Sequence, residues 1–239
     1  MGNGQKQEQL VELCYDFGFS QIGKRPNGED VYCKNHPAKP PSNTVSPLEY
    51  HRLYAPHFKY GNDVGKFVVP IQPAYHDKLF PDCYPTRQQS LFGLNEGQIV
   101  VSMGENIPGN AIKQAYLSHA PIKMLKPGDL LLFYRSHDFR EATTIGVVES
   151  AEHLTGSQKV MERVSKRTVY NSDEIENMSQ RPCLTILFRL AGHIRKPVSS
   201  DVLGVLGING PIQSIRSIDD AIFREIIVRG GIQNCVYAN

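Results

Sequence analysis

The sequence predicts an α+β fold in which short helices surround a mixed β-barrel. Apolar runs of strand length recur in the second part of the chain, at residues 67–71, 98–102, 130–135, 143–150 and 183–190. Segments with helical signals lie between and after them, at residues 110–118, 156–164, 172–178 and 219–228. Because the strands come at irregular intervals and the helices between them are short, the pattern favours a mixed barrel over a regular array of parallel strands and helices.

The N-terminal region, residues 1–35, predicts a helix followed by a hairpin. Apolar side chains recur at helical spacing until Gly18, a residue type that commonly follows the last turn of a helix. An Asn-Gly pair then separates two alternating runs, residues 19–24 and 29–34. Such a pair between alternating runs is a strong hairpin signal.

Two further regions complete the predicted domain organisation. Residues 36–65 are rich in proline and predict a linker. Because this stretch also holds aromatic residues and histidines, we expect part of it to pack on a neighbouring surface. Residues 66–239 form the predicted barrel domain together with its helical C-terminal tail.

Composition indicates a globular protein without a membrane partner. With 239 residues, 40% of them hydrophobic, the chain can fill a core. Its longest apolar runs, such as residues 130–134 and 184–188, fall far short of the roughly 20 residues that a membrane span requires. Residues 1–9 are polar and lack the basic start and apolar middle of a signal peptide. We therefore expect a cytoplasmic protein.

Charge and cysteine content are compatible with an anionic partner and indicate no cofactor. The formal net charge of +2 permits a nucleic-acid partner but does not require one. The 5 cysteines are scattered without zinc-site spacing, and we interpret them as reduced thiols. The 8 histidines form no pair with a nearby acid at metal-ligand spacing. The sequence therefore predicts neither a metal nor another cofactor.

The barrel region resembles the EVE family in two stretches, residues 109–117 (GNAIKQAYL) and 125–136 (LKPGDLLLFYRS). In that family a short helix precedes a Lys-x-Gly-Asp turn and an apolar strand that ends in Phe-Tyr-His-Ser, and a further strand is similar to residues 144–149. The resemblance, which runs in order over residues 66–195, implies a PUA-like barrel of the EVE/ASCH kind. Such barrels, which include ASCH and YTH domains, bind RNA, or modified bases flipped from DNA, in a cleft beside the barrel.

The resemblance and the residue chemistry together predict a base-binding pocket at one rim of the barrel. A base needs an aromatic face to stack on and a few polar groups directed at its edge. We predict that this pocket is lined by Tyr75, Asn110, Lys113, Tyr116, Tyr134, Arg135, Ser136 and His137. Arg135 occupies the position of the family's usual histidine, and Lys113 is the basic residue of the segment in which the family has an arginine. The alternative for a tyrosine that ends an apolar strand is a core residue with its hydroxyl at the surface.

Lys166 and Arg167 precede a predicted helix start and are candidates for contacts with nucleic-acid phosphates. The alternative is a structural cap, because Asp173 and Glu174 already complement the helix dipole and would repel an anion. The leading hypothesis is therefore a non-catalytic module that binds nucleic acid, a nucleotide or a modified nucleobase.

His76 and Asp77 follow the first barrel strand and could suggest acid–base chemistry. Adjacent residues on a turn usually point apart, and no serine or cysteine nucleophile with a defined motif accompanies them. We therefore predict no catalytic residue in this chain.

Residues 10–34 resemble the last helix and two strands of a GNAT acetyltransferase. The loop with which that family holds the pyrophosphate of acetyl-CoA is missing from this sequence. The alternative function is therefore an accessory or C-terminal part of a GNAT-type system, including one of toxin type, with acetyltransferase activity only if the rest of the GNAT domain is supplied elsewhere. This alternative predicts an exposed apolar edge on residues 5–35 for a homodimer or a GNAT-domain partner. A purely structural interaction domain is the third option.

Overall fold

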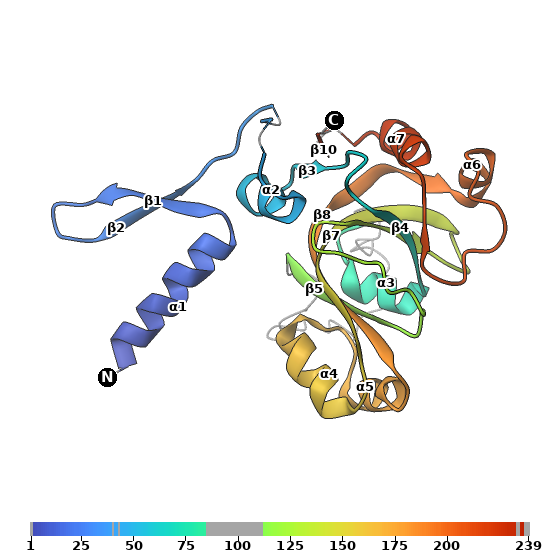
Figure 1. The fold of residues 1–239 in the computed structure, drawn as a ribbon, viewed down its shortest axis with the longest axis horizontal. Coiled ribbons are helices and arrows are strands. Elements are labelled where there is room, and N and C mark those ends of the chain that lie inside the picture. Colours follow the sequence, from blue (N-terminus) through green and yellow to red (C-terminus); the bar gives the residue numbers. More distant parts are fainter. Residues whose placement is uncertain (1, 40, 43, 85–111, 233–234, 237–239) are drawn as a thin grey trace, which may run out of the picture.

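The computed structural model describes residues 2–39, 41–42, 44–84, 112–232 and 235–236. Its centre is a six-stranded sheet in the order β5-β8-β7-β6-β4-β9 (Figure 1). The strands are β4 (Lys66–Ile71), β5 (Lys113–Ser118), β6 (Leu130–Arg135), β7 (Glu141–Leu154), β8 (Cys183–Ser199) and β9 (Arg216–Ser217). β4 and β6 run parallel, and the other neighbours run antiparallel. The α+β class with a mixed sheet is confirmed.

The sheet curls so that two of its strands approach each other without pairing. β7 and β8, 14 and 17 residues long, pair through several register shifts, and such irregularities bend strands. Tyr116 on β5 donates a hydrogen bond of 2.6 Å to the carbonyl oxygen of Pro70 on β4. In the sheet itself β4 pairs with β6 and β9, and β5 pairs with β8. A side chain therefore bridges the gap between β4 and β5.

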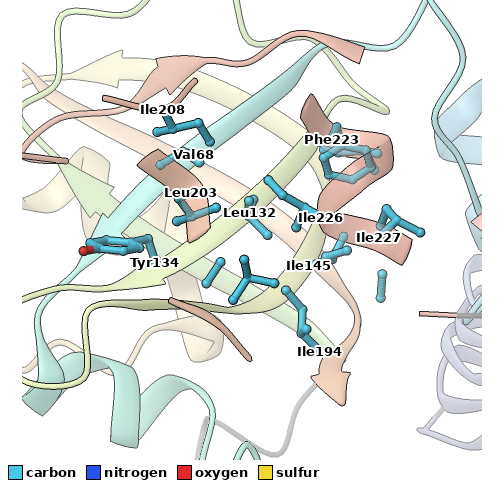
Figure 2. Packing of buried hydrophobic residues seen from close by; sticks show 14 of the residues in the cluster. Val68, Leu132, Tyr134, Ile145, Ile194, Leu203, Ile208, Phe223, Ile226 and Ile227 are labelled. Carbon is cyan, nitrogen blue, oxygen red and sulfur yellow. The ribbon is translucent and has the colours of Figure 1, made fainter. Parts of the chain in front are cut away.

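Both faces of the sheet are buried, because successive side chains of a strand point to opposite sides. On β6, Leu131 and Phe133 belong to one cluster, in which the rings of Phe80 and Phe188 lie with centroids 4.9 Å from that of Phe133. Leu132 points to the other face and packs with residues of α6 (Ser200–Val205) and α7 (Asp220–Arg229), as Figure 2 shows. Burial on two faces explains why β6 is an unbroken apolar run until its last residue.

Short helices cover the rest of the sheet. α3 (Pro73–Leu79) follows β4 and contributes Leu79 to the cluster around Phe133. α4 (Ser157–Val164), the short helix η3 (Ser165–Arg167) and α5 (Ser172–Ser179) come between β7 and β8. Val160 and Ile175 pack in a third cluster with residues of β5 and β8. α5 begins with a capping box between Asn171 and Glu174, which satisfies two backbone N–H groups.

The N-terminal helix and hairpin project away from the sheet (Figure 1). α1 (Gly2–Asp16) leads through Gly18 into the antiparallel strands β1 (Phe19–Lys24) and β2 (Asp30–Lys34), as the sequence predicts. Gly18 has a φ of 78°, and a Cβ atom there would lie 2.1 Å from the carbonyl oxygen of Arg52. Glycine is therefore required at this contact.

Part of the segment predicted as a linker, residues 36–65, is folded. It contains α2 (Pro47–Tyr54) and β3 (Phe58–Lys59), and β3 pairs in parallel with β10 (Cys235–Val236). Tyr50 and His51 on α2 are fully buried. The Nδ1–H group of His51 donates a hydrogen bond of 2.9 Å to the carbonyl oxygen of His57. This part of the segment therefore packs inside the molecule.

The structure corrects the secondary structure of one predicted segment and extends two others. Residues 110–118 are predicted as a helix, but their described part forms β5. Tyr116 pairs with Ile186 in the antiparallel register of β5 and β8, and this tertiary contact overrides the local helical spacing. β7 and β8 continue well beyond the predicted runs. The strand predicted at residues 98–102 lies outside the described residues.

Candidate functional site

A cleft of about 860 Å³ opens at the gap between β4 and β5 that Tyr116 bridges. Its walls come from the end of β4, the start of α3, β5 and the residues after it, the turn between β6 and β7, and the loop before β9. The lining includes Pro70, Ile71, Gln72, Tyr75, Tyr116, Ser118, His119, Tyr134, Ser136, His137, Arg140, Tyr170, Ile212 and Gln213. Segments far apart in the sequence thus supply one concave surface.

Four tyrosines line the cleft, and hydrogen bonds orient several of them. Tyr75 is half-buried, whereas Tyr116, Tyr134 and Tyr170 are buried. The rings of Tyr75 and Tyr170 have centroids 4.7 Å apart, and Oη of Tyr75 donates to Glu174 at 2.9 Å. Burial raises the pKa of Tyr116, and burial together with Glu174 raises the pKa of Tyr75. Both hydroxyl groups therefore stay protonated at neutral pH. The ring of Tyr134 packs in the core, and its hydroxyl points away from the other labelled side chains (Figure 2).

The turn between β6 and β7 places polar groups at the mouth of the cleft. His137 and Arg140 have φ values of 66° and 53°, which residues other than glycine seldom adopt. Both side chains are exposed. Ser136 donates hydrogen bonds from its N and Oγ atoms to the carbonyl oxygen of Ile71, at 2.9 and 3.0 Å, and so ties the turn to β4. Strained backbone conformations cluster at functional sites. In this turn they place the imidazole of His137 and the guanidinium of Arg140 beside the tyrosines of the cleft.

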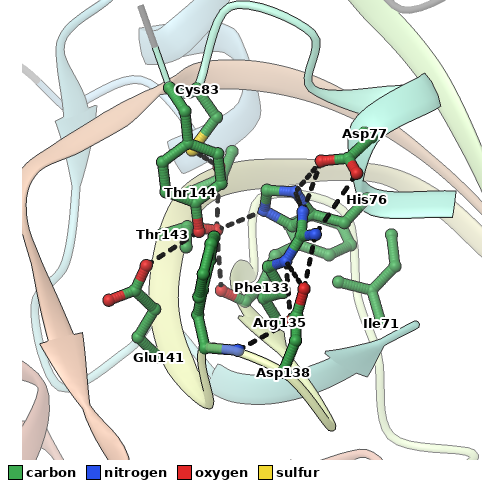
Figure 3. A network of polar contacts seen from close by, with 12 residues as sticks. Ile71, His76, Asp77, Cys83, Phe133, Arg135, Asp138, Glu141, Thr143 and Thr144 are labelled. Carbon is green, nitrogen blue, oxygen red and sulfur yellow. Dashed lines mark hydrogen bonds and ion pairs between the residues drawn. The ribbon is translucent and has the colours of Figure 1, made fainter. Parts of the chain in front are cut away.

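Arg135 is not among the described residues that line the cleft, although the sequence predicts it as a ligand. As the last residue of β6 it points to the face opposite Tyr134, with 2% of its surface exposed. Its guanidinium donates to Asp138 at 2.7 to 3.0 Å, to Asp77, and to Nδ1 of His76 at 3.1 Å (Figure 3). Burial would lower the pKa of Arg135, but the hydrogen bonds with Asp138 and Asp77 raise it above its ordinary value. Arg135 thus holds the turn at the cleft mouth from behind.

His76 and Asp77 both contact Arg135, whereas the sequence predicts that they point apart. They lie on α3 and not on a turn, and α3 packs beside the end of β6. Because Nδ1 of His76 accepts from Arg135, its Nε2–H group donates to Oγ1 of Thr143, at 2.8 Å. Burial and the nearby Arg135 lower the pKa of His76 to about 4. His76 is therefore neutral at physiological pH, with both ring nitrogens engaged inside the protein.

Lys113 and Arg167, predicted to contact base and phosphate, lie in a second cluster outside the cleft lining. Lys113 forms an ion pair with Asp16, and Arg167 contacts Glu149 at 2.6 Å. Asn110 and the side chain of Lys166 lie outside what the structure describes. Of the predicted ligand residues, the structure brings together at the cleft Tyr75, Tyr116, Tyr134, Ser136 and His137.

Sequence reasoning missed several lining residues, among them His119, Arg140 and Tyr170. Arg140 could be found from the sequence, because it lies in the loop between two strongly predicted strands and so at their rim. His119 could not be found, because it follows β5, and residues 110–118 are predicted as a helix and not as a strand of the sheet. Tyr170 is recognisable only as an aromatic residue ahead of a helix start.

Other chemistry is limited in the part of the chain that the structure describes. No group of three or more His, Cys, Asp or Glu side chains there could hold a metal ion. Cys83 and Cys183 are buried free thiols, and burial raises the pKa of both. Within the same described residues, no helix has the length and apolarity to cross a membrane.

Comparisons with known proteins give structural similarity alone. No family model matches the sequence, and no curated protein matches it significantly. The ASCH protein from Zymomonas mobilis aligns with a TM-score of 0.48 and 11% identity over 68% of this chain and 94% of that chain, and a mutant of the same protein reaches 0.49. Protein Atu2648 from Agrobacterium tumefaciens aligns with a TM-score of 0.40 and 12% identity over 72% of this chain and 96% of that chain.

Proposed function

We propose that this protein is a PUA-like module that binds nucleic acid and holds one base in the cleft. The observation that carries the proposal is the concave surface between β4 and β5, where four tyrosines meet the polar turn after β6. Its volume of about 860 Å³ falls in the roughly 300–1,000 Å³ range of small-ligand sites. Aromatic faces combined with a few oriented polar groups are what a splayed-out base requires.

The charge around the cleft supports a phosphate backbone next to the bound base. Arg140 and His137 are exposed at the mouth, and Arg140 supplies a full positive charge. The described lining residues include no aspartate or glutamate. Asp138, which lies in the same turn, has its charge paired with Arg135. Salt-dependent binding is the expected consequence, because a phosphate that contacts a cation releases condensed counterions.

Fluorescence polarisation with labelled single-stranded RNA and DNA, unmodified and carrying modified bases, tests the proposal. Tyr75→Leu removes a half-buried aromatic face, and we expect binding to weaken by about 1–3 kcal/mol, the contribution of one stacked base. Arg140→Gln removes the cation at the mouth and should weaken binding while making it less sensitive to salt. Comparison of the probes identifies the preferred ligand.

The matched control is Arg229→Gln, which removes one exposed arginine on α7 outside the cleft lining. It should bind as the wild type does. The proposal fails if folded Tyr75→Leu and Arg140→Gln proteins bind every probe with wild-type affinity, or if the wild type binds none of them.

A second candidate role is the docking of a partner on the N-terminal helix and hairpin. The observation that favours it is exposed apolar surface: Leu10, Leu13 and Ile22 are 60%, 50% and 65% exposed. We infer that this surface serves a homodimer or the remainder of a GNAT domain, since exposed strand edges pair readily with other chains. Light scattering separates the cases: a dimer that Ile22→Glu converts to a monomer supports self-association, and a monomeric wild type excludes it.

A further inference from the structure

A group of cations on three elements converges on the end of α1. Arg189 on β8 lies opposite Lys113 on β5 in the strand register, and Arg52 lies on α2. Nη2 of Arg189 and Nη2 of Arg52 donate to Oδ1 of Asp16, at 2.7 and 2.9 Å, and Lys113 forms an ion pair with the same carboxylate. These residues are not among the described residues of the cleft lining. Three cations of the main body, the sheet and the helices packed on it, thus contact one carboxylate of the N-terminal segment, which consists of α1 and the β1–β2 hairpin.

This cation cluster holds more positive than negative charge once Asp16 is set aside. Arg189, 2% exposed, also donates from Nε to Glu149 at 2.6 Å, and Arg167 contacts that carboxylate at 2.6 Å. Oε2 of Glu49 lies 3.4 Å from Nη1 of Arg52. Without Asp16, four cations would face two carboxylates at a partly buried site. Because unpaired charge is unfavourable away from water, the buried part of the cluster, Arg189 and Lys113, favours an anion at this place.

Phe17, the residue after Asp16, places an aromatic ring against the same cations. Lys113 Nζ lies 5.5 Å from the centroid of this ring, and the guanidinium carbon of Arg189 lies 5.4 Å from it. Both distances are within the range of cation–π attraction. Asp16 and Phe17 therefore present an anion and a flat ring side by side to one set of cations. A nucleotide presents the same two groups, a phosphate and a base.

The N-terminal segment is fastened to the main body near this point and exposed further out. Gly18 lies against the backbone of Arg52, whereas Leu10, Leu13 and Ile22 are exposed. Figure 1 shows α1 and the β1–β2 hairpin standing away from the sheet. Elements with few buried apolar contacts open at low cost in free energy. The segment can therefore leave the cluster while the sheet stays folded.

We infer that Arg52, Lys113 and Arg189 form a second nucleotide-binding site, which Asp16 and Phe17 occupy as an internal ligand in the free protein. A nucleotide of single-stranded nucleic acid takes their place when the N-terminal segment is released, so the segment inhibits binding at this site. The inference rests on the proposed nucleic-acid function and adds a second contact point for the bound strand.

Asp16→Ala in the full chain tests the inference directly. The variant keeps Arg189 paired with Glu149, so the buried guanidinium retains a carboxylate partner. We expect the affinity for a labelled single-stranded oligonucleotide to rise about tenfold, because the carboxylate that competes with a phosphate is gone. Phe17 and the hydrogen bond of 2.9 Å from Arg189 to the backbone carbonyl oxygen of residue 16 remain in this variant. Asp30→Ala is the matched control: it removes a carboxylate of the same segment that pairs with Lys24 on the hairpin. It should leave the affinity unchanged.

A second substitution shows whether the gain comes from this cluster. Asp16→Ala combined with Lys113→Ala should lose the gain, since one of the three cations is then absent. Asp16→Asn, which keeps the volume of the side chain, replaces the alanine variant if thermal melting shows that the latter is unfolded. A folded Asp16 variant with wild-type affinity overturns the inference, and so does a gain that persists in the double variant.

Hydrogen exchange on the unaltered protein gives an independent test. A saturating oligonucleotide should speed exchange at the amides of residues 16–24, because the segment is displaced; unchanged or slower exchange overturns the inference.

The Tyr75→Leu variant separates the two proposed sites. If it abolishes binding while Asp16→Ala has no effect, the cleft stands and the second site falls. If Asp16→Ala increases affinity while Tyr75→Leu binds normally, the second site stands and the cleft falls.

Discussion

Arg135 acts on the cleft indirectly, through the turn that it holds. Its guanidinium joins Asp138 in the turn to Asp77 on α3, so one buried cation fixes two elements. Removing Asp77 or Asp138 is unfavourable, because the guanidinium of Arg135 is buried and then loses one of its two counter-charges. Arg135 is therefore a positioning residue, and a substitution there would disturb the polar groups at the cleft mouth without touching a ligand.

Two buried histidines make the stability of the protein depend on pH. The pKa of His51 and that of His76 are each lowered to about 4 from 6.5, chiefly by burial. Between pH 6.5 and pH 4 the unfolded chain therefore binds more protons than the folded protein. The free energy of unfolding rises with pH across this window and falls as the pH drops through it. We expect each histidine to contribute about 3 kcal/mol to that fall.

Urea unfolding at neutral pH and near the lower end of this window measures the effect, with His51→Gln and His76→Gln as comparisons. Each variant should lose less stability on acidification than the wild type, because one lowered pKa is gone while the carboxylates titrate as before. Equal losses in all three proteins would show that neither histidine is held neutral by the fold.

At the scale of elements, Gly18 decides how the N-terminal segment is attached. Gly18 and Gly28 have φ values of 78° and 88°, so an alanine at either position meets a backbone penalty of about 1–2 kcal/mol. At Gly18 the added Cβ would also lie 2.1 Å from the carbonyl oxygen of Arg52, whereas at Gly28 nothing lies within 4 Å. We therefore expect Gly18→Ala to detach α1 and the hairpin, and Gly28→Ala to weaken the hairpin alone.

Hydrogen exchange and limited proteolysis of the two glycine variants check this expectation. Gly18→Ala should lose protection around residues 16–18, while Gly28→Ala keeps it there. The melting temperature of the main sheet should change little in both. Similar protection at residues 16–18 in the two variants would show that the close approach to α2 does not hold the segment.

Elements with strong local signals could be predicted from the sequence, and elements that depend on distant partners could not. The strand predicted at residues 130–135 matches β6, and the helices predicted at residues 156–164 and 172–178 match α4 and α5 to within a residue at each end. β5 has helical spacing and becomes a strand because β8 lies beside it. Pro73 makes the start of α3 resemble a turn, although proline is well tolerated at the first position of a helix.

At the scale of the whole molecule, the candidate cleft is only partly predictable because it forms between elements. The sequence identifies the tyrosines, but Tyr134 and the residue after it face opposite sides of the sheet, and that alternation assigns only one of them to the cleft. Lys113 has the chemistry of a nucleic-acid contact, yet it pairs with Asp16, far away in the sequence. Only the folded chain shows that this cation already has an internal partner.

The two proposed sites should therefore differ in how binding depends on salt. Each phosphate contact by a cation contributes about −0.7 to the slope of log K against log salt for a single strand. In the wild type, nucleic acid exchanges one anion, Asp16, for another at the second site, so few counterions are released there. In Asp16→Ala the cations of that site carry solution anions, which a phosphate must displace.

We accordingly expect the salt slope of Asp16→Ala to be steeper than that of the wild type by about 0.7 or more. Binding titrations of the same oligonucleotide across a salt series measure both slopes. Adding Lys113→Ala to Asp16→Ala should make the slope shallower again, because one cation is removed, whereas Arg140→Gln should reduce the slope in either background through the cleft. Identical slopes in the wild type and Asp16→Ala would mean that the cations around Asp16 only anchor the N-terminal segment and take no part in binding.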